Sequence, residues 1–223
     1  MALNPPRDIR LIAFDLDGTL VDGIDYIWSA LHRHFGSDPG RREKARDDFF
    51  ARRITYRRWF EIDLELLRER GAHRRGILDL LRKLRPTPGA HETLGELVRR
   101  GYRLALLSGS LDVVLEHFFA DVPFCQVFIN RLFFDETGAI AGGEPTPYDL
   151  EGKAEGLAEA ARREGLSLSQ CAFVGDNVND LSVMRAAGLS LAVFPKSPAL
   201  AKSAHQVIRE PTLAAILPFF PPR

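Results

Sequence analysis

Two aspartates separated by a single residue, Asp15 and Asp17, follow a short apolar run that starts at Ile9. Paired carboxylates can share covalent and acid–base chemistry, in which one attacks an electrophile and the other moves a proton. A lone aspartate after a strand more often belongs to a turn. Chemistry is the better interpretation here because other polar groups stand at comparable places, namely Ser108-Gly109-Ser110, Lys153 and Gly175-Asp176-Asn177-Val178-Asn179-Asp180.

The acidic members of this set predict a divalent cation. Carboxylates crowded at strand ends would repel one another unless a cation joined them, and hard oxygen ligands of this kind suit Mg²⁺. With Asp15 and Asp176 as direct ligands, the metal would keep positions for water and one phosphate oxygen, and it would lower the charge barrier to attack on phosphorus. We therefore expect Mg²⁺ as the cofactor and a phosphorylated substrate.

The other members of the set are suited to holding that phosphate. Ser108 offers a hydroxyl, and we expect the amides of Gly109 and Ser110 at a helix start, where backbone N–H groups bind anions. Lys153 would supply a compact positive charge against both the phosphate and the carboxylates. Asp17 could reach the far side of the phosphate as a general acid and then as a base.

The elements that must position these residues follow from the apolar pattern. Four short apolar segments have the profile of strands buried on both faces of a parallel sheet: 9–14, 102–107, 171–174 and 189–194. Helical stretches lie between them at 91–100, 153–164 and 180–187, each followed by a glycine. This alternation predicts an α/β fold with a doubly wound parallel sheet, whose ligands bind at the carboxyl ends of the strands.

Two regions interrupt the alternation. Residues 23–85 contain no convincing strand, only charged segments with helical periodicity, so we predict an inserted helical cap whose clearest helix begins at Thr55 and ends at Gly71. The predicted core domain comprises residues 1–22 and 86–223. Residues 128–142, around Asp135-Glu136-Thr137-Gly138, are predicted to form a β-hairpin appended to the sheet.

The order of motifs resembles one known superfamily. Asp-x-Asp-Gly-Thr after an apolar strand, followed by Ser-Gly, a lysine and Gly-Asp-x-x-x-Asp, is similar to the haloacid dehalogenase superfamily of phosphatases, and within it to the phosphoserine phosphatase-like group. The resemblance covers essentially the whole chain. It implies a Rossmann-like core with an inserted cap, and a Mg²⁺-dependent phosphatase that hydrolyses a small phosphomonoester through an aspartyl phosphate.

The resemblance also implies roles for individual residues. Asp15 would be the nucleophile and Asp17 the acid and base, while Mg²⁺ would be bound by Asp15, the carbonyl of Asp17 and Asp176. The phosphate would be held by Ser108, Gly109, Lys153 and Asn179, with Thr19 and Asp180 as supporting residues.

The cap departs from the phosphoserine-specific members of the group. Those members carry a glutamate nine residues past the nucleophile, where this chain has Ile24, and a cap arginine where counting along the chain gives Asp63. Phosphoserine is therefore an alternative substrate and not the default one. The residues that we expect to face the substrate from the cap side are Asp22, Arg53 and Arg57.

Several other functions stay open at this stage. A dehalogenase would need neither Asp17 nor Mg²⁺, so the full acidic set argues against it. A phosphomutase or other phosphotransferase would keep that set, and a non-catalytic binding protein would keep the fold without the chemistry. The helical cap supplies the substrate contacts, so the motifs do not name the substrate.

Composition limits the partners. Thirty basic residues balance thirty acidic ones, so the chain has no general attraction to nucleic acid or to an anionic membrane. The sequence offers no apolar stretch long enough to span a bilayer and no signal-like N-terminus, and we expect a cytoplasmic protein that acts on a small phosphorylated metabolite. Cys125 and Cys171 are predicted to be buried thiols. The oligomeric state is not predictable.

Overall fold

Strand β1 (Leu11–Phe14) lies at the centre of a seven-stranded sheet in the computed structural model, which describes residues 8–223. The strand order is β6-β5-β4-β1-β7-β8-β9, and every neighbouring pair is parallel except β5 and β6. The other strands are β4 (Arg103–Leu111), β5 (Phe124–Phe134), β6 (Ile140–Glu144), β7 (Cys171–Gly175), β8 (Leu189–Val193) and β9 (Gln206–Ile208). The predicted α/β fold is confirmed.

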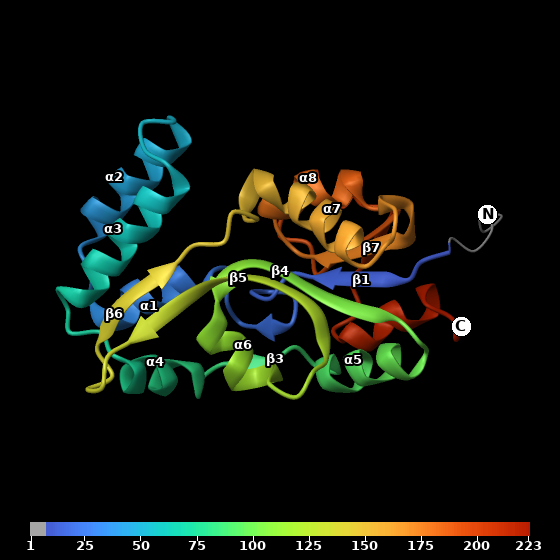
Figure 1. Ribbon diagram of the computed structural model, residues 1–223, viewed down its shortest axis with the longest axis horizontal. Coiled ribbons are helices and arrows are strands. Elements are labelled where there is room, and N and C mark those ends of the chain that lie inside the picture. Colours follow the sequence, from blue (N-terminus) through green and yellow to red (C-terminus); the bar gives the residue numbers. More distant parts are fainter. Residues whose placement is uncertain (1–7) are drawn as a thin grey trace.

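Helices cover both faces of this sheet (Figure 1). On one face lie α7 (Lys153–Arg163) and α8 (Leu181–Ala186), and on the other α5 (Ala90–Arg99) and α6 (Asp112–Phe119). All four residues of β1 are buried, because alternate side chains point to opposite faces. Ile12 and Phe14 pack with the α5 and α6 side, whereas Leu11 and Ala13 pack with the α7 and α8 side. A short helix α9 (Pro198–Ser203) precedes β9.

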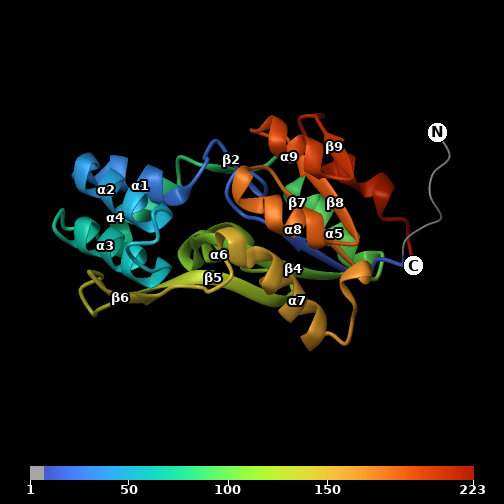
Figure 2. The same cartoon turned by 90° about the horizontal axis from the view of Figure 1, so that it is seen from above.

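The predicted helical unit consists of α1 (Ile27–Phe35), α2 (Pro39–Phe50), α3 (Tyr56–Arg68) and α4 (Arg74–Leu81). Helix α3 begins where the sequence predicts, since the Thr55 side chain accepts a hydrogen bond from the Arg58 backbone N–H at 3.2 Å. Figure 2 shows this unit beside the core. We refer to it as the cap.

Two short strands join the cap to the core. The chain enters the cap through β2 (Val21–Asp22) and leaves it through β3 (Arg85–Pro86), and these strands pair antiparallel. We propose that this pair marks the boundary between a core of residues 1–22 and 86–223 and a cap of residues 23–85. Residues 1–7 make up most of the N-terminus that was predicted not to resemble a signal sequence, and they lie outside the described residues.

The predicted hairpin is present and extends beyond the core. Strands β5 and β6 pair antiparallel around the Asp135–Gly138 turn, and β6 lies alongside α3 in both views (Figures 1 and 2). The Arg68 guanidinium of α3 donates to the Ile140 carbonyl at 2.8 Å. The first half of β5 is also a parallel strand of the core sheet, paired with β4, which the sequence pattern did not predict.

Two expectations about local structure are wrong. Ser108, Gly109 and Ser110 lie inside β4, which runs on to Leu111, so they do not form a helix start. The serines and glycine interrupt the apolar run, but pairing with β5 continues after a register shift. Cys171 is buried as predicted, whereas Cys125 is exposed and lies at a register shift in the pairing of β4 and β5. Among residues 8–223, no helix is both long and apolar enough to cross a bilayer.

Candidate active site

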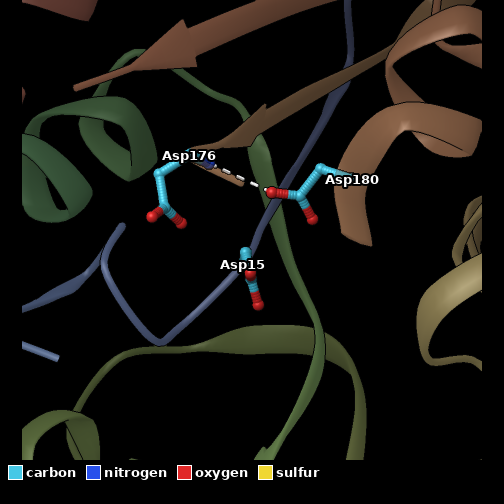
Figure 3. A group of neighbouring side chains, drawn as sticks. All are labelled: Asp15, Asp176 and Asp180. Carbon is cyan, nitrogen blue, oxygen red and sulfur yellow. Dashed lines mark hydrogen bonds between the residues drawn. The ribbon is translucent and has the colours of Figure 1, made fainter. Parts of the chain in front are cut away.

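Three aspartates from two loops form a buried acidic cluster (Figure 3). Asp15 follows β1, Asp176 follows β7, and Asp180 lies four residues further on, with one oxygen of each within 4.8 Å of the others. The strands are parallel neighbours, so their carboxyl ends bring these loops together. Burial, reinforced by the charges of Asp15 and Asp180, raises the pKa of Asp176 to about 7.

The cluster fits a divalent cation of the hard type. All of its ligand atoms are carboxylate oxygens, the kind of ligand that a hard cation prefers. Burial also raises the pKa of Asp180, although the nearby Lys153 opposes this effect. Raised pKa values of neighbouring carboxyls mean that their shared negative charge is unfavourable without a cation, which is the condition under which a metal binds.

Lys153 is the buried cation of the site. It is the first residue of α7, its side chain is fully buried, and its Nζ atom lies 3.0 Å from Asp15 Oδ2 and 2.6 Å from Asp180 Oδ1. Burial disfavours its charge, but Asp15, Asp180 and Asp149 together raise the pKa of Lys153 above its ordinary value. The ammonium therefore stays charged between the two carboxylates.

Asp17 is held apart from the acidic cluster by two donors. The Ser110 hydroxyl donates to its Oδ1 at 2.7 Å, and the backbone N–H of Ile27, the first residue of α1, donates to its Oδ2 at 2.6 Å. Burial nevertheless raises the pKa of Asp17 to about 7, because it outweighs these hydrogen bonds. A carboxyl that exchanges its proton near neutral pH is suited to general acid and base chemistry.

Gly109 stands where no side chain fits. A Cβ atom there would lie 2.1 Å from Asp149 Oδ2, and the Gly109 carbonyl accepts from Trp28 Nε1 at 2.9 Å and from Asn130 Nδ2 at 2.7 Å. The buried Ser108 hydroxyl accepts from the Ser110 backbone N–H at 3.2 Å. The Ser110 amide is thus already engaged, which differs from the free helix-start donor that we expected.

The remaining predicted site residues support the cluster. The Thr19 hydroxyl donates to Asp176 Oδ1 at 2.9 Å, and the Nδ2 atom of Asn179 lies 3.5 Å from Asp15 Oδ2. Asp180 Oδ2 accepts from the backbone N–H groups of Asp176 and Asn177 at 3.0 and 3.2 Å. The structure therefore brings Asp15, Asp176, Lys153, Thr19, Asn179 and Asp180 into one network.

Lys196 belongs to the site and was missed by the sequence analysis. Its Nζ atom lies 2.9 Å from Asp176 Oδ2 and 2.8 Å from Asp25 Oδ1, and it donates to the Ile24 carbonyl at 3.0 Å. A signal for it exists in the sequence, because it follows the fourth predicted strand, just as Asp15 follows the first.

A cavity of about 830 Å³ connects this site to the cap. Its core wall includes Asp15, Asp17, Ser108, Gly109 and Asn179. Its cap wall contains aromatic and charged residues from three helices: Trp28, Ser29, His32, Arg33, Arg42, Glu43, Arg46, Phe50, Tyr56, Trp59, Phe60 and Asp63. A molecule bound here would contact both parts of the chain.

The three residues expected to face the substrate from the cap side do not line this cavity. The Arg53 guanidinium turns back to Asp48 at 2.6 Å, and Arg57 is exposed on the outer side of α3. The Asp22 carboxylate accepts from the Gly23 backbone N–H at 2.7 Å, which is a turn contact. Helical spacing alone could not tell which side of α3 faces the core, so the arginines of α1 and α2 were overlooked.

Family membership follows from the same segments. A model of the haloacid dehalogenase-like hydrolases matches residues 9–188, which include all four loop groups. The chain belongs to the haloacid dehalogenase-like hydrolase family. Two relatives of this haloacid dehalogenase-like hydrolase are named phosphoserine phosphatase. The relative from Methanocaldococcus jannaschii is 29% identical over 212 residues, which are 94% of this chain and 97% of that protein.

The second relative, from Streptomyces coelicolor, is 31% identical over 221 residues and 95% of this chain, but the chain spans only 50% of that longer protein. Among solved structures, this haloacid dehalogenase-like hydrolase is similar to one described as a phospho-aspartyl intermediate analogue of phosphoserine phosphatase. The TM-score is 0.73 at 27% identity, over 95% of this chain and 99% of that chain.

Proposed function

We propose that this protein is a Mg²⁺-dependent phosphatase that hydrolyses a small phosphomonoester through a phosphoryl group carried on Asp15. One observation carries the proposal: the Asp15 carboxylate lies at the cavity wall, beside the Lys153 ammonium and within a buried acidic cluster that fits a cation. The phospho-aspartyl description of the similar solved structure supports it.

In the first half of the reaction, an Asp15 oxygen forms a bond to phosphorus and the bond from phosphorus to the ester oxygen breaks. The departing oxygen takes the proton of Asp17, whose raised pKa keeps a protonated fraction near neutral pH. Lys153, at 3.0 Å from Asp15, offsets the negative charge that gathers on the phosphoryl oxygens. The products are free alcohol and an aspartyl phosphate.

In the second half, a water molecule attacks phosphorus and gives its proton to the Asp17 carboxylate. The bond between phosphorus and the Asp15 oxygen breaks, which releases inorganic phosphate and restores both aspartates to their starting states. Ser110 and the Ile27 amide hold the Asp17 carboxyl in one place through both steps. Asp15, Asp176 and the carbonyl of Asp17 would hold Mg²⁺, which when bound neutralises phosphoryl charge.

Phosphate would be held by groups on the core wall of the cavity. We propose Ser108, Gly109, Lys153 and Asn179 for this role, since each lies beside Asp15 or lines the cavity. The Nδ2 atom of Asn179 is 3.5 Å from Asp15, and its Oδ1 atom has no hydrogen-bond partner in the described chain. Asp180 acts through Lys153 and the Asp176 backbone, and Thr19 acts through Asp176.

Phosphoserine is the second candidate substrate. The names of the two relatives described above favour it. Against it, Ile24 and Asp63 stand where the sequence comparison expects a glutamate and an arginine, and Asp63 is buried against His32 at 2.9 Å.

The test is a phosphate-release assay on a panel of phosphomonoesters that includes phosphoserine, with Mg²⁺ and with a chelator. We expect release only with Mg²⁺, and loss of all release in Asp15→Asn. Asp121→Asn, an exposed position outside the cavity, is the matched control and should keep full activity. Phosphate release by the Asp15→Asn variant, or phosphate release by the wild type that continues unchanged in the presence of the chelator, would refute the assignment.

A further inference from the structure

The cap end of the cavity has an aromatic wall. We call this end of the cavity the cap chamber and define it by the lining residues Trp28, His32, Arg42, Phe50, Trp59 and Asp63. The Trp59 ring stacks on Phe49 with centroids 4.9 Å apart, and Trp28 meets Phe60 edge to face at 5.5 Å. Phe50 lines the cavity although it is 63% exposed, so its ring is available to a bound molecule. Such a wall binds flat apolar groups.

The cavity is larger than a phosphoserine molecule requires. Cavities of about 300 to 1,000 Å³ accommodate ligands of drug size. At about 830 Å³ this cavity lies in the upper part of that range, after room is left for one phosphate at Asp15. A leaving group of a few heavy atoms would leave most of the aromatic wall without a contact.

Unpartnered polar atoms gather in the same chamber. Between residues 8 and 223, eight buried side-chain nitrogen or oxygen atoms lack a hydrogen-bond partner, and five of them belong to His32, Arg42, Trp59 and Asp63. His32 Nε2 and Asp63 Oδ1 form an ion pair at 2.9 Å. His32 Nδ1 and Trp59 Nε1 remain, whereas Arg42 Nε lies 3.8 Å from Asp63 Oδ1. Both remaining donors belong to residues that line the cavity, so a polar substituent on the bound molecule would complete their pairing.

The charges of the chamber select the kind of substituent. Of the two cap carboxylates that line the cavity, Asp63 lies 2.9 Å from His32 and 3.8 Å from Arg42, and Glu43 lies 3.3 Å from Arg46. Neither is left for the ammonium group of an amino acid. Three cap arginines, Arg33, Arg42 and Arg46, line the cavity against these two carboxylates, so the chamber favours an acceptor, above all a carboxylate.

We propose that the alcohol released by this enzyme is a planar aromatic alcohol that carries an anionic or acceptor substituent, bound in the cap chamber. This inference rests on the proposed function and adds the substrate class to it. The phosphate of the ester lies at Asp15, the ring lies against Trp59 and Phe50, and the substituent reaches Arg42.

Four esters separate the contributions of ring, substituent and amino acid group: ethyl phosphate, benzyl phosphate, 4-carboxybenzyl phosphate and O-phosphoserine. All four are phosphates of primary alcohols, so leaving-group reactivity contributes little to differences between them. With Mg²⁺ present, kcat/KM should rise about tenfold from ethyl to benzyl phosphate and about tenfold again with the carboxylate. O-phosphoserine should stay near ethyl phosphate.

Three variants locate these preferences in the chamber. Phe50→Ala should lower the ratio of kcat/KM for benzyl phosphate to kcat/KM for ethyl phosphate about fivefold. Because Phe50 is exposed, its replacement should leave the protein folded. Arg42→Gln should lower the ratio of 4-carboxybenzyl to benzyl phosphate about tenfold. Arg41→Gln, at the neighbouring position, is the matched control. The Arg41 guanidinium is exposed, pairs with Glu69 at 2.6 Å and does not line the cavity, so neither ratio of kcat/KM should change.

The outcomes distinguish an error in the substrate class from an error in the phosphatase assignment. Equal kcat/KM for ethyl and benzyl phosphate, higher kcat/KM for O-phosphoserine, or equal ratios in Arg42→Gln and Arg41→Gln would overturn the substrate class and leave the phosphatase assignment intact. No release from any of the four esters with Mg²⁺ would overturn both.

Discussion

At the scale of single residues, Lys153 sets the charge balance of the site. Its ammonium is fully buried between Asp15 and Asp180 and is the shared partner of both carboxylates. A buried ion pair contributes little net stability as a whole, but removal of one partner leaves an uncompensated buried charge. The same residue therefore affects both stability and phosphate binding.

Lys153→Met should lower the free energy of unfolding by about 3 to 5 kcal/mol and abolish turnover, since methionine fills the space without the charge. Urea unfolding and the phosphate-release assay measure the two effects. The exposed Lys202→Met change on α9 should alter neither. A Lys153→Met protein as stable as the wild type would show that Asp15 and Asp180 do not depend on this ammonium.

Gly109 and Gly95 give a second pair of opposite expectations. A Cβ at residue 109 would lie 2.1 Å from Asp149 Oδ2, which Tyr56 holds in place, so Gly109→Ala must displace the wall of the phosphate site. We expect kcat/KM to fall about a hundredfold. Gly95→Ala in α5 meets only the flexible end of Arg99 and should raise stability by about 0.5 to 1 kcal/mol. Full activity in Gly109→Ala would contradict the tight fit.

The residue scale is also where the sequence was most informative about chemistry. Asp15, Asp176 and Lys153 could be predicted to converge because each stands beside the end of a buried strand or opens a helix. Partners such as Asn130 and Asp149 could not, since nothing in their local sequence separates them from turn or strand residues. Their contacts to Gly109 exist only once β4 and β5 are paired.

At the scale of elements, two side chains attach the cap to the phosphate wall. Trp28 of α1 donates to the Gly109 carbonyl at 2.9 Å, and the Tyr56 hydroxyl of α3 donates to Asp149 Oδ2 at 2.9 Å. Asn130 of β5 donates to both Gly109 and Tyr56. Both cap helices thus begin beside groups that touch the proposed phosphate site, so the position of the cap fixes the geometry of that site.

Tyr56→Phe should weaken this attachment, because it leaves the buried Oδ2 atom of Asp149 without its donor, while Oδ1 keeps the Leu150 backbone N–H. We expect kcat/KM to fall about tenfold and backbone hydrogen exchange in α3 to become faster. Tyr148→Phe is the control, since the Tyr148 hydroxyl has no hydrogen bond to residues 8–223 and its ring packs against Phe128 and the core on the α7 side. Equal effects of the two changes would mean that Tyr56 merely packs.

Element positions were predictable where apolar periodicity is strong and not where pairing decides. The strands that became β1, β4, β7 and β8 and the helices α5, α7 and α8 follow from buried runs and terminal glycines. The parallel half of β5 and the short edge strand β9 alternate exposed and buried residues or are too brief to stand out. The extension of β4 through Ser108-Gly109-Ser110 depends on hydrogen bonds to β5, which local sequence does not encode.

At the scale of the whole molecule, the chain has no net charge, yet its most buried region concentrates acidic groups. The native state should therefore gain stability from a divalent cation, which binds the folded cluster and not the unfolded chain. We expect Mg²⁺ at about a hundred times its Kd to raise Tm by about 5 to 10 °C. Potassium chloride at equal ionic strength should have little effect.

The Asp176→Asn variant tests the site of this stabilisation. It removes one charge of the cluster, so Mg²⁺ should no longer raise its Tm by more than the potassium salt does. Differential scanning calorimetry of both proteins, each with and without Mg²⁺, gives the comparison. An unchanged Mg²⁺ response in Asp176→Asn would place the metal elsewhere.

The central claim is that the phosphoryl group passes through Asp15. It is tested most directly by acid quench of the Mg²⁺-loaded protein during turnover, followed by peptide mass spectrometry. The account predicts the mass of one phosphoryl group on Asp15 in the wild type and on no residue in Asp15→Asn. A phosphoryl group on any other residue, or turnover in Asp15→Asn, would contradict it.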